Sequence, residues 1–386
     1  MHHPLDGIRV VDLCSNLAGP YCGQILADMG ADVIKVERPG TGDPSRAWAP
    51  PAWGGEGTLF LSSNRGKRSL ALELGTDDAQ EILHRLLDTA DVAIQAFRPD
   101  VARRFGLTEE ALRPRHPSLV FCSITAFDPG GPHAERPGYD PLLQAHSGLM
   151  SMTGPPQGPP VRVGTSIVDM GAGMWAAIGI LGALRTREAT GRGHHLRISL
   201  EDTALAWGAY HLQGTLASGR APKPMGTGLG MIVPYGAFPT GDGHLMIAAG
   251  TDALFQALCR ALGLEGLAED PRLATNPGRV AHRAEVEGAL ARATRRLTVK
   301  ALESALSSAG VPCSRVRDYG EVASDPHVLG GIFRREAHPE IPDYRAVGPP
   351  VVTDGERPEA GRPPPSVGEH TAEILEELAR GPASGP

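Results

Sequence analysis

Two short apolar runs on either side of a helical pattern constrain how this chain begins to fold. The runs span residues 8–13 and 33–36, and the helical pattern between them passes through Ile25 and Met29 before Gly30 ends it. Strands joined through a helix pair in parallel, and the crossover between them is right-handed in nearly all proteins. The first forty residues therefore predict a βαβ unit.

The alternation of strand and helix patterns continues through the N-terminal half. Apolar segments at 93–97 and 119–124 alternate with helical patterns at 79–87 and 109–112. This alternation is typical of a doubly wound α/β layer with a parallel sheet. The apolar stretch 170–184 is shorter than the roughly 18 residues of a membrane span, so we expect a buried helix there.

The pattern changes near residue 205. Strand patterns at 235–238 and 245–248 enclose a Gly-Asp-Gly turn at 241–243, which is typical of a β-hairpin. Helical patterns follow at 253–262, 283–295 and 299–307. We therefore predict a large α/β domain at 1–205, a linker at 206–225 and a smaller α+β domain at 226–325.

The charge balance and the cysteines argue against several classes of function. The chain has 37 Lys and Arg against 44 Asp and Glu, and its net charge of −7 predicts no binding to nucleic acid or to a membrane surface. Its five cysteines are scattered without a Cys-x-x-Cys, so we expect neither a disulfide framework nor a metal site. The first residues lack a basic region followed by an apolar run, and we expect a cytoplasmic protein.

The first strand–loop–helix segment lacks the fingerprint of dinucleotide binding. Its glycines, Gly19 and Gly23, do not follow the spacing Gly-x-Gly-x-x-Gly. The acid at the end of the second strand, Glu37, is followed at once by Arg38. We therefore do not expect NAD or FAD as a cofactor.

Cations next to an aromatic residue gather where predicted strands begin or end. Arg38 ends one strand, Phe97 and Arg98 follow another with Arg104 close behind, and Lys67 precedes a third. Parallel sheets bind ligands at the carboxyl ends of their strands, and guanidinium groups bind phosphate oxygens and stack on rings. The cluster favours a ligand with phosphates and a flat ring, although a solvated basic face would carry the same residues.

Seven short motifs occur in order along the chain. They read PLDGIRV at 4–10, GADVIKVERPG at 30–40, NRGKRS at 64–69, FRP at 97–99, GYD at 138–140, TGRG at 190–193 and GEHT at 368–371. Together they resemble the class III CoA-transferase family, which includes formyl-CoA transferase, carnitine CoA-transferase and α-methylacyl-CoA racemase. The resemblance implies a Rossmann-like large domain built from both chain ends, to which residues 326–386 return. It also implies an interlocked homodimer, in which each chain threads through a hole in the other.

The resemblance implies coenzyme A as the ligand of the cation cluster. It places CoA against Arg38, Leu72, Phe97, Arg98 and Arg104, and Lys67 of the cluster is a further candidate contact. The implied substrates are an acyl-CoA and a small carboxylic acid, with no metal.

The family's transferases are expected to carry a catalytic loop of the form Gly-x-x-Asp-Gly-Pro-Pro. The aspartate attacks the donor thioester and forms an acyl-enzyme anhydride. Residues 154–160 of this chain read Gly-Pro-Pro-Gln-Gly-Pro-Pro, so Gln157 stands at the position of the aspartate. An amide cannot form the anhydride, although it can hydrogen-bond to a thioester carbonyl. We therefore expect transfer by a different route, through another carboxylate such as Asp169 or Asp140.

The racemases of the family suggest a second chemistry, which is abstraction of the proton α to the thioester by a His-Asp pair. This chain has Tyr139 in place of that histidine, before Asp140, and it keeps Asp169 as the second partner. Because tyrosine is a weak base with a pKa near 10, a two-base mechanism fits imperfectly. Asp140 can equally hold backbone amides, and Asp169 can equally cap the helix that follows it.

A glycine-rich loop in the smaller domain contains Gly226, Gly228 and Gly230 and can bring backbone N–H groups to a ligand. By resemblance, this loop closes over the acyl group. Three functions stay open at this point. The first is CoA transfer between carboxylic acids, the second is racemisation or isomerisation of an acyl-CoA, and the third is a catalytically silent CoA-binding subunit that supports an active paralogue in a heteromer.

Overall fold

The computed structural model describes residues 3–357 and 361–380, and the chain divides into two compact units. Unit 1 contains the described residues of Met1–Ser147, Gly164–Ala209 and Pro326–Pro386. Unit 2 consists of Gly148–Val163 and Tyr210–Asp325. The predicted large domain at 1–205 does not account for residues 148–163, which cluster with unit 2.

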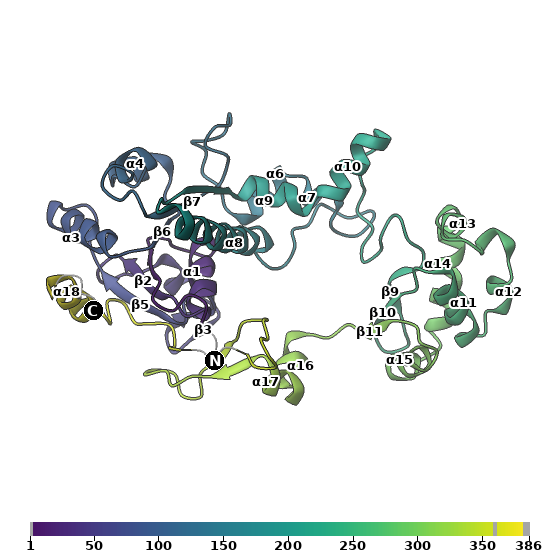
Figure 1. The fold of residues 1–386 in the computed structure, drawn as a ribbon. Coiled ribbons are helices and arrows are strands. Elements are labelled where there is room, and N and C mark those ends of the chain that lie inside the picture. The colour runs from purple at the N-terminus through teal and green to yellow at the C-terminus, as the bar shows by residue number, and fades with distance from the viewer. Residues whose placement is uncertain (1–2, 358–360, 381–386) are drawn as a thin grey trace. The chain divides into compact units, whose positions relative to one another are not determined.

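A six-stranded sheet forms the centre of unit 1 (Figure 1). Its strands are β1 (Arg9–Asp12), β2 (Asp32–Glu37), β5 (Lys67–Ala71), β6 (Val92–Gln95), β7 (Val120–Thr125) and β8 (His195–Ser199). They lie in the order β5-β2-β1-β6-β7-β8, and every neighbouring pair is parallel. This is the Rossmann order, and it confirms the predicted α/β fold. The order reverses between β1 and β6, and such sheets bind ligands near that point, at the carboxyl ends of the strands.

Helices pack on both faces of this sheet. Helix α1 (Ala18–Asp28) packs along α8 (Ile167–Thr190), which also contacts β7 and β8. Gly173 permits this close approach, because a Cβ atom there would lie 2.5 Å from the Ala18 carbonyl oxygen. On the other face, side chains of α3 (Asp77–Asp88), α5 (Glu109–Leu112) and α18 (Thr371–Arg380) share one apolar core with the strands.

Helix α8 contains the expected buried helix and extends beyond it at both ends. Within the described residues it is the one helix that is long and apolar enough to cross a membrane. Half of its most apolar stretch is buried inside the fold. Its glycines and alanines pack against α1 and β7, so it is a core helix of unit 1.

The other elements of unit 1 are short. They are η1 (Pro44–Ala47), β3 (Ala52–Trp53), β4 (Glu56–Gly57), α2 (Thr58–Ser63), α4 (Pro99–Arg104), α6 (Asp140–His146), α9 (Leu200–Trp207), α17 (Pro326–Gly331), β12 (Phe333–Arg335) and β13 (Arg345–Val347). Strands β12 and β13 form an antiparallel hairpin. Tyr344 and Ile341 pack with Phe60 of α2 in a small separate core, which attaches the hairpin to unit 1.

A three-stranded antiparallel sheet and several helices make up unit 2. The sheet has the order β11-β10-β9, with β9 (Tyr235–Pro239), β10 (His244–Ala248) and β11 (Cys313–Arg315). The helices are α7 (Leu149–Met152), α10 (Ala209–Ser218, which starts at the end of unit 1), α11 (Asp252–Ala261), α12 (Glu265–Ala268), η2 (Pro271–Leu273), α13 (Asn276–Ala281), α14 (Arg283–Thr294), α15 (Val299–Ser308) and α16 (Tyr319–Ser324). The predicted hairpin and the three predicted helices are confirmed as β9–β10, α11, α14 and α15.

A group of fully buried charges lies in the core of unit 1. Lys67 of β5 pairs with Asp12 of β1 at 2.8 Å, and Lys35 of β2 pairs with Asp43 at 2.9 Å. Burial would raise the pKa of Asp12, but the charges of Lys67 and Lys35 outweigh it and hold that pKa below its usual value. The Lys67 ammonium also donates to the Pro20 carbonyl oxygen at 2.7 Å. Each charge is thus compensated inside the protein, as burial of a charge requires.

Candidate active site

The predicted CoA contacts gather at the carboxyl ends of three strands. Arg38 follows β2, Leu72 follows β5, and Phe97 and Arg98 follow β6. The Leu72 N–H donates to the Glu37 carbonyl oxygen at 2.8 Å, which keeps the ends of β2 and β5 side by side. Arg38 and Arg98 are exposed, whereas Leu72 and Phe97 pack partly into the core. This edge therefore offers exposed guanidinium groups beside apolar surface.

Helix α4 brings Arg104 to the same edge. The Arg104 guanidinium lies 4.9 Å from the centre of the Phe105 ring, and that ring meets Phe97 edge to face at 5.6 Å. Among the described residues Arg104 has no ion-pair partner, whereas its neighbour Arg103 pairs with Glu135 at 3.3 Å. The ring contacts thus hold Arg104 near Phe97 with its donors free to bind a phosphate.

Lys67, the remaining cation of the predicted cluster, lies inside the protein. Its side chain has no exposed surface, and Asp12, Pro20 and Asn64 accept its three hydrogen bonds at 2.7–2.8 Å. All three donors of the ammonium group are used. The expectation that Lys67 contacts CoA is therefore corrected, because a strand that is buried on both faces points this side chain into the core.

Asp169 is the third residue of α8 and lies in its first turn. The side chain is partly buried, and within the described part of the chain no group donates a hydrogen bond to its carboxylate. Burial, together with the charge of neighbouring Asp140, raises the pKa of Asp169 to about 7. A carboxylate that is poorly solvated and unpaired is more nucleophilic than one held by a cation.

Asp140 is fully buried and holds the start of α8. One of its carboxylate oxygens accepts the N–H groups of Val168 and Asp169 at 2.7 and 3.2 Å, and the other accepts from Gln144 at 2.6 Å. The suggestion that Asp169 itself caps this helix is wrong, because Asp140 supplies the acceptor. Tyr139, which precedes α6, is 57% exposed.

Gln157 lies in a turn of unit 2. The turn is closed by the Gly158 N–H, which donates to the Pro155 carbonyl oxygen at 3.0 Å, and by the Val161 N–H, which donates to the Thr153 carbonyl oxygen at 3.4 Å. Gln157 is exposed, and its side chain makes no hydrogen bond within the described residues. The Gln157 amide is neutral and solvated, whereas the Asp169 carboxylate can ionise and is partly buried. Gln157 is therefore the poorer nucleophile of the two.

The glycine loop of unit 2 is held by a side chain of α14. Arg283 donates to the carbonyl oxygens of Leu229 and Gly230 at 2.8 and 2.9 Å. The Gly226 N–H donates to the Gly154 carbonyl oxygen at 2.8 Å, which links this loop to the segment that carries Gln157. The two loops that the sequence singled out in unit 2 are therefore neighbours.

The comparison with protein families decides the family of this chain. The profile of CoA-transferase family III matches residues 5–371. The chain belongs to CoA-transferase family III. As a CoA-transferase it uses an acyl-CoA thioester as substrate, and the resemblance carried by the seven sequence motifs is confirmed.

Other members of CoA-transferase family III match along nearly the whole chain. A succinate–glutarate CoA-transferase from Agrobacterium fabrum is 40% identical over 385 residues, covering 97% of this chain and 96% of that protein. A succinyl-CoA:glutarate CoA-transferase from Mus musculus is 37% identical over 379 residues, covering 98% and 87%. The crystal structure of a CaiB/BaiF family protein from Brucella suis has a TM-score of 0.87 and 36% identity, covering 98% of this chain and 100% of that one.

Sequence reasoning missed the environment that distinguishes this CoA-transferase's carboxylates. Asp140 and Asp169 are 29 residues apart, and no local sequence motif indicates that Asp140 caps the helix in which Asp169 lies. The available signal was the acid at the start of a long apolar helix. Arg283 was also missed, because a single arginine at a helix start has no distinctive pattern. In the part of the chain that the structure describes, no three His, Cys, Asp or Glu side chains form a metal-ligating group.

Proposed function

We propose that this chain transfers CoA between carboxylic acids and that Asp169 is the nucleophile. The observation that carries the proposal is a partly buried carboxylate without a hydrogen-bond donor, with a pKa near 7, in the first turn of α8. The presence of Gln157 where the expected loop has an aspartate is then compatible with covalent transfer, because Asp169 performs the covalent step.

The reaction proceeds through covalent intermediates on Asp169. Its carboxylate oxygen attacks the thioester carbonyl of the donor, the C–S bond breaks, and CoA leaves as a thiolate with a mixed anhydride on the enzyme. The thiolate attacks the Asp169 carbonyl carbon, releases the donor acid and leaves an aspartyl-CoA thioester. The acceptor carboxylate attacks the Asp169 carbonyl carbon of that thioester, expels the CoA thiolate and forms a second mixed anhydride. The thiolate then attacks the acyl carbon of the acceptor, which gives the new acyl-CoA and releases the Asp169 carboxylate.

Parts of the protein have separate roles in this reaction. Arg38, Arg98 and Arg104 bind the phosphates of CoA, and Leu72 and Phe97 contact its apolar parts. Asp140 acts as a positioning residue, because it fixes the first turn of α8. By the family resemblance, the backbone N–H groups of the loop with Gly226, Gly228 and Gly230 bind the acyl group of the substrate, and no role is assigned to Tyr139.

We expect the acceptor and the donor acid to be small dicarboxylic acids. The names of the two relatives above support this class, since both combine succinate or succinyl-CoA with glutarate. The test is incubation of the purified protein in D₂O with succinyl-CoA and glutarate, within a panel of acyl-CoA thioesters and free acids, followed by mass spectrometry of the CoA pool. CoA on a new acid supports the proposal. Deuterium at the α-carbon without transfer would instead support a racemase or isomerase, and neither product would support a silent subunit.

The family resemblance and the cysteines bear on the assembly and on the compartment. The family resemblance supports an interlocked homodimer, which sedimentation equilibrium would detect. The five free cysteines, which form no disulfide among the described residues, support a reducing compartment such as the cytoplasm.

Activity is expected to rise with pH along an acid limb centred near pH 7. Only the ionised Asp169 attacks a thioester, and burial together with the charge of Asp140 raises its pKa to about 7, so activity is lost as the pH falls through that value. Asp140→Asn removes the negative charge but keeps an acceptor oxygen for the helix, and the limb should move to lower pH. The measurement is kcat/KM from about pH 5 to about pH 9. A limb that stays in place in Asp140→Asn would contradict the assignment.

Arg104→Ala is expected to raise the KM for acyl-CoA about tenfold with little change in kcat, because it removes one charge-assisted contact to a phosphate. Arg103→Ala is the matched control, since Arg103 is on the same helix but pairs with Glu135. Steady-state kinetics with succinyl-CoA as the varied substrate measures both. Equal KM values for the two variants would show that Arg104 does not bind CoA.

A further inference from the structure

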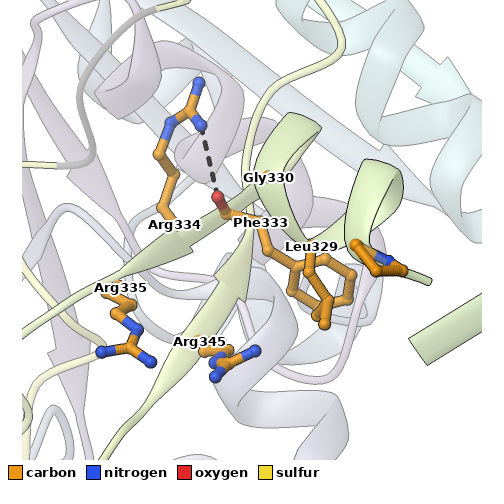
Figure 2. Close-up of a pocket in the computed structure, with 7 residues that line it drawn as sticks. Leu329, Gly330, Phe333, Arg334, Arg335 and Arg345 are labelled. Atoms are coloured by element: carbon orange, nitrogen blue, oxygen red, sulfur yellow. Dashed lines mark hydrogen bonds between the residues drawn. The ribbon is translucent and has the colours of Figure 1, made fainter. Parts of the chain in front are cut away.

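The hairpin β12–β13 and helix α17 line an open pocket of about 360 Å³ in unit 1 (Figure 2). Apolar groups, among them Leu329 of α17 and Phe333 of β12, line one side. Arg335 and Arg345 line another, and Figure 2 shows them on the same side of the hairpin. The pocket therefore combines apolar surface with two guanidinium groups.

Arg335 and Arg345 are directly opposite one another on the two strands. Side chains of directly opposed residues in an antiparallel pair project from the same face of the sheet and interact. Like charges in that position destabilise the pair. The hairpin therefore carries an electrostatic cost that a bound anion would remove.

Few protein groups compensate these two charges. Within the described residues Arg345 has no ion pair, and the one acid near Arg335 is Asp343 at 3.9 Å, with both side chains mostly exposed. Glu336 follows Arg335, but its two carboxylate oxygens are buried, and the charges that act on it are those of Arg65 and Asp28. Neither acid satisfies the paired guanidinium groups.

The third arginine of the pocket, Arg334, already binds backbone carbonyl oxygens. Arg334 donates to the carbonyl oxygens of Gly331 and Phe333, both at 3.2 Å, and Figure 2 shows it directed away from the other two. Its role is to fix the turn between α17 and β12. Two arginines, not three, are therefore available to a ligand.

We propose that the Arg335–Arg345 pair binds a phosphate group, either as inorganic phosphate or as a phosphomonoester. A phosphate dianion balances two guanidinium charges, and its oxygens accept forked hydrogen bonds from both arginines at once. A single carboxylate balances only one of the two charges. The apolar side of the pocket, with Leu329 and Phe333, offers a surface for the organic part of a phosphomonoester.

This site is distinct from the proposed CoA site. The hairpin is anchored by Tyr344, whose hydroxyl donates to the Leu61 carbonyl oxygen at 3.0 Å, and by Arg65, which donates to the Val347 carbonyl oxygen at 2.6 Å. Leu61 and Arg65 precede β5 in the chain, so the hairpin attaches near the amino end of that strand. The predicted CoA contacts lie at the carboxyl ends of the strands.

Calorimetric titration of the full chain with inorganic phosphate, at constant ionic strength, tests the proposal. Wild type and the variant R38Q/R104Q should bind phosphate at this site with the same affinity, and R335Q/R345Q should bind at least about tenfold more weakly. A parallel titration of R38Q/R104Q with adenosine 5′-monophosphate distinguishes the sources, because the proposed CoA site, which would also bind this nucleotide, is weakened in that variant. Tighter binding than inorganic phosphate identifies a phosphomonoester, and equal binding identifies the inorganic ion.

A second readout rests on the repulsion itself. Arg345→Gln should raise the thermal midpoint in phosphate-free, low-salt buffer by about 1–3 °C, and added phosphate should no longer raise it further. Arg185→Gln, which changes an exposed arginine elsewhere in unit 1, should leave the thermal midpoint unchanged. Added phosphate should raise the midpoint of this variant as it does that of wild type. Phosphate affinity that is unchanged in R335Q/R345Q would overturn the proposal, as would an Arg345→Gln protein that phosphate still stabilises like wild type. CoA transfer should persist in R335Q/R345Q, so loss of the phosphate site and loss of the proposed function give different results.

Discussion

Asp169→Asn should abolish CoA transfer, with kcat reduced roughly 10⁴-fold or more, as when other covalent nucleophiles are removed. The amide has the size of the carboxylate but cannot form a mixed anhydride or an aspartyl thioester. The variant should fold normally, because the Asp169 carboxylate accepts no hydrogen bond within the described residues and its removal relieves repulsion from Asp140. Steady-state transfer from succinyl-CoA to glutarate measures the loss, and intact-protein mass spectrometry should show an adduct on wild type alone.

Gln157→Ala is the matched comparison for this experiment. Because Gln157 is exposed and its side chain makes no hydrogen bond within the described residues, its truncation should leave kcat within about threefold of wild type. The reverse pattern, with full activity in Asp169→Asn and none in Gln157→Ala, would show that the reaction depends on the loop at 154–160. It would reject Asp169 as the nucleophile.

Asp12→Ala should lower the free energy of unfolding by about 3–5 kcal/mol, because it leaves the Lys67 ammonium buried without its carboxylate. Lys35, which is also fully buried, lies close enough to Asp12 to add to the uncompensated charge. Urea denaturation followed by circular dichroism measures the change. We expect the urea midpoint of Asp12→Ala to lie well below that of wild type.

Glu188→Ala provides the control for the buried pair. Glu188 pairs with Arg185 at 2.6 Å, but both side chains are mostly exposed, so solvent already compensates the charges. Its denaturation midpoint should match that of wild type within error. If Asp12→Ala unfolds at the same urea concentration as Glu188→Ala, the buried pair does not hold unit 1 together in the way argued above.

Much of the fold follows from the local pattern of the sequence. The strands around residues 10, 34, 94 and 122 were visible because fully buried parallel strands are continuous apolar runs. The hairpin β9–β10 was visible because its Asp-Gly turn has few alternatives. The small hairpin β12–β13 was not, since its strands are three residues long and contain three arginines between them.

The candidate site was only partly predictable, for a physical reason. Position at a strand end is a local property, so the places of Arg38, Phe97 and Arg98 just after β2 and β6 could be predicted. Burial and pairing are not local, and Lys67 was therefore misplaced at the ligand although it is enclosed by Asp12, Pro20 and Asn64. The surroundings of Asp169 depend on Asp140, which comes from a different helix.

The position of α18 at the far end of the chain has a consequence for biosynthesis. Its Ile374 and Leu378 fill the same core as β1, and Glu377 pairs with Arg9 at 3.0 Å. A ribosome adding about 5–20 residues per second takes tens of seconds to travel between these partners. During that interval the apolar face of the nascent sheet lacks its last cover, while unit 2, which follows most of unit 1 in the chain, can already fold. Newly made chains should thus depend on holdase chaperones until translation passes α18.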